Sequence, residues 1–351
     1  MALRLGNMRE RLVPAGIDES NTHGVTEFSI RRVAAASAGS LTCPELSLLD
    51  YFRNPKYDMC NDHTHFQEAA MIRIITDSAA DLSPAEYAKY QITCIPLTVM
   101  FAENEFRENV NLSKDQFYEL LLALEAPPKT AQPSPQYLMD LYEQAHEAGD
   151  GAIYIPLSSA ISGTYQTALM TKNMLGYDDC HVADSLTATG GQRLVVQHAA
   201  KLRDEGKSAE EIIAGIEDVR SRIRLFACID TLEYLYKGGR ISHTVYKLGT
   251  LANIKPIITV ESDGSIGIPA KAMGMRKGMD TLCKYAAARA ADPDFPFYVM
   301  YTNNRDVARQ LAKKLQSVGI SVDEDQIIQV GAAIGSHIGP DACGLVYVAA
   351  K

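Results

Sequence analysis

Residues 71–78 read MIRIITDS, a short apolar run that ends in a polar turn. Such a run is typical of the first buried strand of an α/β domain. The next signal is Ser83-Pro84-Ala85-Glu86, in which a serine cap, a proline and a glutamate predict the start of a helix. The sequence therefore predicts that an α/β fold begins at Met71.

Strand-like and helix-like segments continue to alternate up to about residue 222. Alternation of this kind predicts a mostly parallel, doubly wound sheet with helices on both faces. The expected strands are residues 72–76, 92–101, 151–157 and 180–184, and the expected helices begin near Ser83, Ser113, Ser134, Gly163, Thr189 and Ser208.

The rest of the chain has a different pattern, with a hairpin signal at residues 261–264 and sparser helices. We expect a smaller, antiparallel-rich α+β domain there. The predicted organisation is a parallel α/β domain at 71–225 and an α+β domain at 226–351, preceded by an extension at 1–70.

Residues 1–70 show weak periodicity and lack the basic and apolar regions of a secretory signal. They can be a poorly structured extension, a regulatory arm, or upstream sequence translated from a misassigned start. We favour the last interpretation, with Met71 as the natural start. His63 and His65 could suggest a metal site, but a solvated loop explains them better, because no third ligand is nearby.

Composition narrows the function classes. The 351 residues carry 34 basic and 43 acidic side chains, a net charge of −9 that makes nucleic-acid binding a poor match. We find no apolar run long enough to span a membrane. The seven cysteines are widely spaced and predict free thiols in a reducing cytoplasm rather than a disulfide framework or a metal site.

The common nucleotide-binding, metalloprotease and hydrolase motifs are missing, and neither a cofactor nor a metal is expected. Small polar clusters follow the expected strands instead. Asp77 and Ser78 end the first strand, and Thr130 lies in a proline-stiffened loop that also carries an amide at Gln132. Residues 157–165 read LSSAISGTY, with more hydroxyl groups than one helix cap requires. A helix start offers free N–H groups, so this cluster is a candidate anion site.

Two further clusters lie in the second half. Residues 237–242 read KGGRIS, in which paired glycines expose Arg240 at an expected helix start. Residues 335–344 read GSHIGPDACG, and we expect His337 to be held in a rigid glycine-rich loop before the last strand.

These polar clusters, and their order along the chain, resemble those of the DegV family of bacterial fatty-acid-binding proteins. This family includes the FakB acyl carriers. The resemblance covers 71–351 and none of 1–70. Ala131 stands where serine is common, and Asp341 where glycine is common. The matching segments are residues 74–78, 130–134, 157–165, 238–241, 255–257 and 337–340.

This resemblance implies one long-chain fatty acid bound between the two domains. By position, Thr130 and Ser162 would hold its carboxylate, with Ser159 and His337 as neighbours. It further implies a carrier without catalytic residues, which presents the acyl group to a separate fatty acid kinase for acyl-phosphate formation and phospholipid synthesis. Arg240 would contact that kinase. A transient contact with a membrane surface stays open.

Two other functions remain open from the residues alone. In a serine hydrolase, Ser162 would be the nucleophile, His337 the base and Asp77 its orienting acid. A sugar- or phosphate-binding module is the other alternative, although it would need more charged or aromatic ligands near the serine cluster.

Overall fold

The first sheet is parallel, as the sequence predicts. The computed structural model describes residues 71–124, 126–247 and 253–351. In this sheet β1 (Ile72–Asp77) lies between two parallel neighbours, and the strand order is β2-β1-β6-β7. Its other members are β2 (Ile92–Ile95), β6 (Gly151–Ile155) and β7 (Cys180–Val182).

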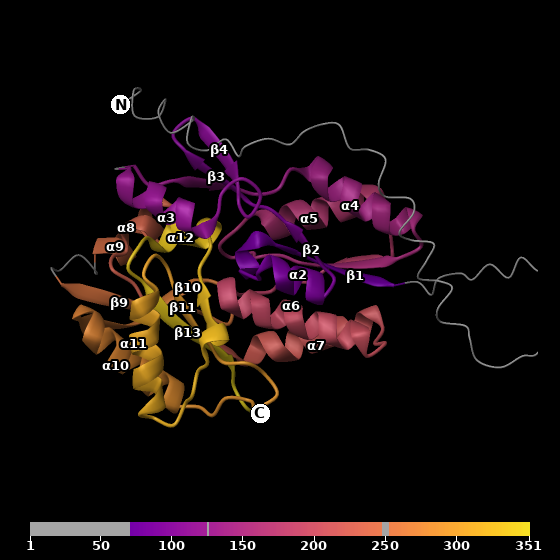
Figure 1. Ribbon diagram of the computed structural model, residues 1–351. Helices are drawn as coiled ribbons and strands as arrows, with labels where there is room; N and C mark the ends of the chain where they lie inside the picture. The colour runs from indigo at the N-terminus through magenta and orange to yellow at the C-terminus, as the bar shows by residue number, and fades with distance from the viewer. Residues whose placement is uncertain (1–70, 125, 248–252) are drawn as a thin grey trace, which may run out of the picture. The chain divides into compact units, whose positions relative to one another are not determined.

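Alternate residues of these strands face opposite helix layers. Ile75 and Tyr154 pack with α4 and α5, whereas Ile74 and Ile153 pack with α6 and α7. The two helix pairs therefore cover opposite faces, as a doubly wound sheet requires (Figure 1). The expected serine caps of four helices are confirmed. The helices of this part are η1 (Ser78–Ala80), α2 (Pro84–Lys89), α3 (Lys114–Ala123), α4 (Pro135–Glu147), α5 (Thr164–Leu175), α6 (Thr189–Asp204) and α7 (Ala209–Arg222).

The second sheet is mixed and mostly antiparallel, with the order β10-β9-β8-β13-β11-β12. The predicted hairpin at residues 261–264 joins β9 to β10. One face packs against α10 (Gly274–Ala287) and α11 (Arg305–Gln316). The strands are β8 (Ile223–Cys228), β9 (Ile254–Val260), β10 (Ile266–Met273), β11 (Tyr298–Tyr301), β12 (Ile327–Gln329) and β13 (Cys343–Val348), with η2 (Glu324–Gln326) before β12.

The prediction of one strand over residues 92–101 is wrong. The parallel strand β2 ends at Ile95, and Pro96 follows it without an N–H to donate. The N–H of Leu97 instead bonds the Ser78 hydroxyl, and the chain enters a separate antiparallel sheet of order β4-β3-β5. The sequence did not predict this sheet, which contains β3 (Thr98–Phe101), β4 (Asn104–Arg107) and β5 (Lys129–Ala131).

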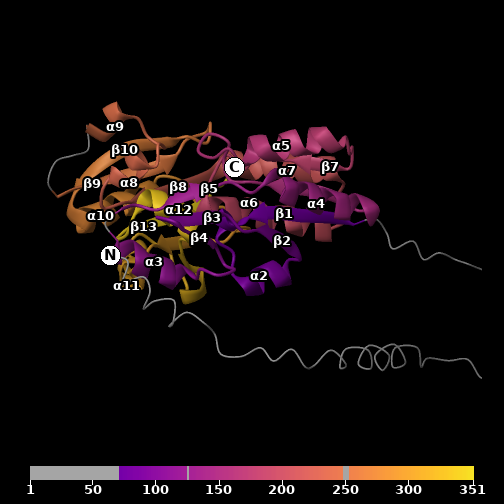
Figure 2. The same cartoon turned by 90° about the horizontal axis from the view of Figure 1, so that it is seen from above.

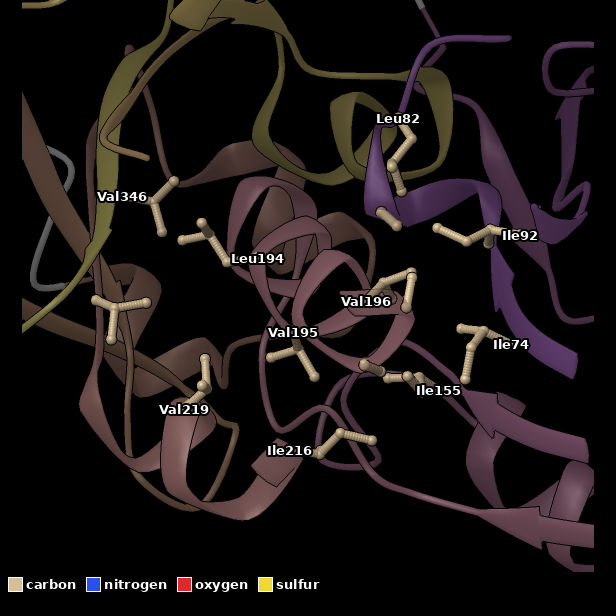
Figure 3. Close-up of a cluster of buried hydrophobic side chains, with 14 of the residues drawn as sticks. Ile74, Leu82, Ile92, Ile155, Leu194, Val195, Val196, Ile216, Val219 and Val346 are labelled. Carbon is tan, nitrogen blue, oxygen red and sulfur yellow. The ribbon is translucent and has the colours of Figure 1, made fainter. Parts of the chain in front are cut away.

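Helix α6 lies between the four-stranded and six-stranded sheets. Leu194 faces Val346 of β13, and Val196 faces Ile74 and Ile155 on the other side (Figure 3). Figure 2 shows the four-stranded sheet toward the right of the view and the six-stranded sheet toward the left. At the start of α6, a Cβ added to Gly190 would lie 2.6 Å from Val346 Cγ1, so glycine permits this close approach.

The chain passes from α7 into the second sheet at Ile223, near residue 225, where we place the boundary between the two proposed domains. All described residues belong to one compact unit. The expectations for residues 1–70, including a metal site at His63 and His65, lie outside the described residues.

Burial on both sides makes α6 a sensitive element of the fold. Replacing the buried Leu194 by alanine should lower the free energy of unfolding by about 2–5 kcal/mol, since a core cavity remains. The same change at Leu122, whose side chain is 61% exposed, should alter it by less than about 0.5 kcal/mol. Urea unfolding of both variants measures the difference, and equal values would contradict this packing.

Candidate functional site

A cavity of about 320 Å³ lies between the inner face of the mixed sheet and the segments that carry the predicted site residues. Leu157, Ile161 and Ser162 line it from the serine-rich loop, and Thr130 lines it from β5. The helices α8 (Glu233–Lys237) and α12 (Ala332–Ile338) also contribute to its wall. Most of the lining is apolar, which suits a hydrocarbon ligand.

The floor of the cavity is a row of side chains across four strands. Met300, Gly344, Ala227 and Ile258 are register partners in turn, from β11 through β13 and β8 to β9, and all line the cavity. The two central positions carry the smallest side chains. A Cβ added to Gly344 would lie 2.8 Å from the Phe226 carbonyl oxygen. Small residues at the centre of the row therefore leave space over the sheet.

Thr130 lies in the short strand β5 opposite Val99, and not in a loop as predicted. Pairing with β3 gives its backbone ladder hydrogen bonds, which the local proline pattern did not reveal. The Thr130 hydroxyl lies 2.9 Å from His337 Nε2. Two residues that the sequence placed 207 positions apart thus meet at the cavity.

His337 lies in the last turn of α12, so the prediction of a rigid loop is wrong. Gly335 lets this helix pack closely on α3, because an added Cβ would lie 2.6 Å from the Phe117 ring. Burial, and then the charge of Arg240, lowers the pKa of His337 to about 3. Its imidazole is therefore neutral at physiological pH and offers a polar contact without a positive charge.

Ser162 lines the cavity, and its hydroxyl lies 2.8 Å from the Thr164 hydroxyl. Helix α5 begins there, and its N-cap Gly163 provides no side-chain cap. Ser158 ties the same loop to the β9–β10 hairpin by donating to the Gly264 carbonyl at 2.9 Å. Ser159 lies outside the lining, and its N–H bonds the Asp184 carboxylate.

Arg240 is half-buried and lines the cavity, so the prediction that the paired glycines expose it is wrong. It lies between α8 and α9 (His243–Lys247), not at a helix start. Gly239, at φ +74°, turns the chain so that Arg240 bonds two carbonyls, those of Ile161 and Gly238. The first of these bonds fixes the loop that carries Ser162.

The polar groups form one cluster. His337 bonds Thr130, and its ring so nearly touches Gly238 that an added Cβ would lie 2.1 Å from Nδ1. Gln132, which the sequence analysis noted without a role, lines the cavity, and its Oε1 would lie 2.3 Å from a Cβ on Gly163. This arrangement provides neutral hydroxyl, amide and imidazole groups with one nearby guanidinium.

The structure does not assemble the Ser–His–Asp arrangement of a hydrolase. Asp77 is fully buried and accepts hydrogen bonds from the backbone of Ala79 and Leu157 and from Gln192. Burial raises its pKa to about 6, while these bonds oppose the shift. The hydrogen-bond partners of Asp77 do not include His337, and the Ser162 hydroxyl bonds Thr164 instead.

Within residues 71–124, 126–247 and 253–351, no group of three or more His, Cys, Asp or Glu side chains could hold a metal ion. In the same ranges, no helix combines the length and the hydropathy needed to cross a lipid bilayer.

These features define an α/β protein with an apolar cavity over a mixed sheet and a polar cluster at its lining. A model of the family described as "Uncharacterised protein, DegV family COG1307" matches residues 71–350. The chain therefore belongs to the DegV family, which confirms the resemblance drawn from its motifs.

Relatives and solved structures are similar over the same part of the chain. DegV domain-containing protein BH3627 of Halalkalibacterium halodurans is 34% identical over 283 residues, which are 80% of this chain and 99% of the relative. A DegV family protein from Thermus thermophilus, described by its fatty acid binding, has a TM-score of 0.72 and 28% identity. The match covers 80% of this chain and 100% of that protein's chain. DegV of Bacillus subtilis, described as a fatty acid binding protein, has a TM-score of 0.68 and 28% identity, with the same coverage.

Proposed function

We propose that this protein binds a long-chain fatty acid in the cavity. The carboxylate would lie at the cluster of Thr130, Ser162 and His337, and the acyl tail over the floor at Ala227 and Gly344. The observation that carries this proposal is a single cluster of polar side chains in the lining of a cavity that is otherwise largely apolar. The solved relatives described as fatty-acid-binding proteins support it.

The two parts of the cavity would contribute differently to affinity. Each buried methylene contributes about 0.8 kcal/mol, so a sixteen-carbon tail can supply on the order of 10 kcal/mol before ordering costs. A hydrogen bond to a charged group contributes only about 1.5–3 kcal/mol. We therefore expect the tail to set most of the affinity and the hydroxyl groups to set the orientation of the carboxylate.

We further propose that the protein is a carrier that presents the bound carboxylate to a separate fatty acid kinase. A carboxylate oxygen would attack the γ-phosphorus of ATP on the kinase, giving acyl phosphate and ADP, for use in phospholipid synthesis. The neutral donors support this role, because they hold the carboxylate without a tight ion pair. Arg240, beside the cluster, would contact the kinase or the phosphate.

Extraction of the purified full chain tests fatty acid binding. We expect organic extracts to contain about one long-chain fatty acid per protein. Loss of one hydroxyl in Thr130→Ala or Ser162→Ala should weaken binding about 10- to 100-fold, from the strength of a hydrogen bond to a charged group. Ser159→Ala is the matched control and should bind as the wild type does, because Ser159 lies outside the lining.

Mass spectrometry of the extracts and titration with added fatty acid measure both effects. An empty wild-type protein that also takes up no added fatty acid would contradict the proposed function. Equal losses in all three variants would contradict the assignment of Thr130 and Ser162.

The kinase role has a separate test, in which the loaded carrier is mixed with a fatty acid kinase and ATP. With wild-type and Arg240→Ala proteins both saturated with fatty acid, Arg240→Ala should reduce acyl-phosphate formation at least about tenfold, since one charge-assisted contact is lost. Lys129→Ala, at an exposed residue next to Thr130, is the control and should change it little. Unchanged turnover in Arg240→Ala would refute the contact.

A further inference from the structure

Two buried carboxylates hold the first turn of α12. Glu108 is 1% exposed and accepts hydrogen bonds from the backbone N–H groups of Ala332 and Ala333, the latter at 3.3 Å. Asp81 accepts from the N–H of Gly331 at 2.7 Å. These donors begin a helix more than 220 residues away along the chain, so α12 is anchored to the first half of the fold.

The two carboxylates also lie close to each other. A Cβ added to Gly331 would lie 2.1 Å from Glu108 Oε1 and 2.7 Å from Asp81 Oδ1. Lys114 supplies a positive charge to this cluster, and its Nζ bonds Asp81 at 2.9 Å. Glu108 instead accepts from the neutral Ser78 hydroxyl at 2.6 Å. Glu108 is thus the member of the pair whose negative charge is less well compensated.

Helix α12 joins this cluster to the cavity. Ala333, Ile334, His337 and Ile338 all line the cavity, so the position of the helix sets both an apolar wall and the imidazole at the polar cluster. His337 follows Ala332 by five residues, about 7.5 Å along a helix axis. Glu108 and an anionic ligand beside His337 would therefore lie at opposite ends of one short helix, where two negative charges repel each other through the poorly screening protein interior.

We propose that Glu108 is a positioning residue for the bound carboxylate, and that its ionisation weakens the binding of an anionic ligand at the other end of α12. This inference rests on the proposed fatty acid binding and deepens it. As a hydrogen-bond acceptor Glu108 places α12, and as a titrating group it makes ligand affinity depend on pH.

The direction of the pH effect follows from how the charge of the ligand changes the pKa of Glu108. Burial and then the charge of Asp81 raise the pKa of Glu108 to about 7. A ligand carboxylate adds a further negative charge, which raises this pKa again, so binding takes up a proton. Affinity should therefore fall as pH rises through neutrality. The titratable and charged groups that interact with Glu108 are Asp81, Lys114, Cys94 and Tyr118. Further out, Asp77 interacts with Cys94, Arg193 bonds the Asp81 carbonyl, and His337 with Arg240 beside it lies at the far end of α12.

The test is calorimetric titration of the delipidated full chain with sodium oleate at pH 6, 7 and 8. We expect wild-type affinity to fall about three- to tenfold between pH 6 and pH 8, the order of effect that one added buried charge produces. Glu108→Gln resembles protonated Glu108 and keeps an acceptor for α12. It should bind like the wild type at pH 6, show a clearly flatter pH profile, and bind more tightly than the wild type at pH 8. A slope that remains in Glu108→Gln belongs to other groups, such as Asp77 with its pKa of about 6.

Two other variants complete the test. Glu105→Gln, at an exposed residue of β4, is the matched control and should keep the wild-type pH profile. Glu108→Ala removes the acceptor as well as the charge and should bind about tenfold more weakly than Glu108→Gln at every pH. If Glu108→Ala does not fold, the loss of folding itself shows that the acceptor is needed to hold α12, and the Glu108→Gln profile still tests the pH coupling.

A flat wild-type profile, or a Glu108→Gln profile with the wild-type slope, would overturn the pH coupling. A folded Glu108→Ala variant with wild-type affinity at pH 6 would overturn the positioning role. The absence of oleate binding by the wild type at every pH would instead overturn the proposed function itself, so the two failures are distinguishable.

Discussion

The structure depends on the burial of α6 between two sheets. Leu194 and Val196 pack in opposite directions from one helix, toward β13 and toward the parallel sheet. Gly190 brings the start of this helix within contact of Val346 and Met300. Because α6 is apolar on both sides, neither sheet can lose it without exposing a large hydrophobic surface. This constraint fixes the inner face of the mixed sheet, on which the cavity lies.

Hydrogen bonds between buried polar groups also connect α6 to its neighbours. Gln192, also on α6, donates to Asp77 at the end of β1, and Thr189 donates to Asp81. Asp81 and Glu108 then hold the start of α12, whose last turn carries His337. A continuous set of contacts therefore connects the central helix to the polar cluster of the cavity. In such a network, satisfied hydrogen bonds specify one arrangement of the elements.

The sequence predicted the parts of this fold that local patterns encode. The capping signals at Ser83 and Ser208 and the hairpin at residues 261–264 were confirmed. The cavity floor was not found, because Ala227 and Gly344 become neighbours only through register pairing of distant strands. The sequence signal that could have revealed the floor is Gly344, because a glycine in a buried strand often marks the close approach of a ligand or another backbone. Glu108 lies in a polar stretch that looks like a solvated turn, so its burial was not predictable.

The central claim is that the cavity holds an acyl chain with its carboxylate at the polar cluster. The most direct measurement is a crystal structure of the purified protein with its co-purified ligand. The account predicts density for an unbranched tail over Ala227 and Gly344, with a carboxylate within hydrogen-bonding distance of the Thr130 and Ser162 hydroxyls. Density for a compact polar ligand, or for a tail whose polar end lies over Gly344, would contradict it.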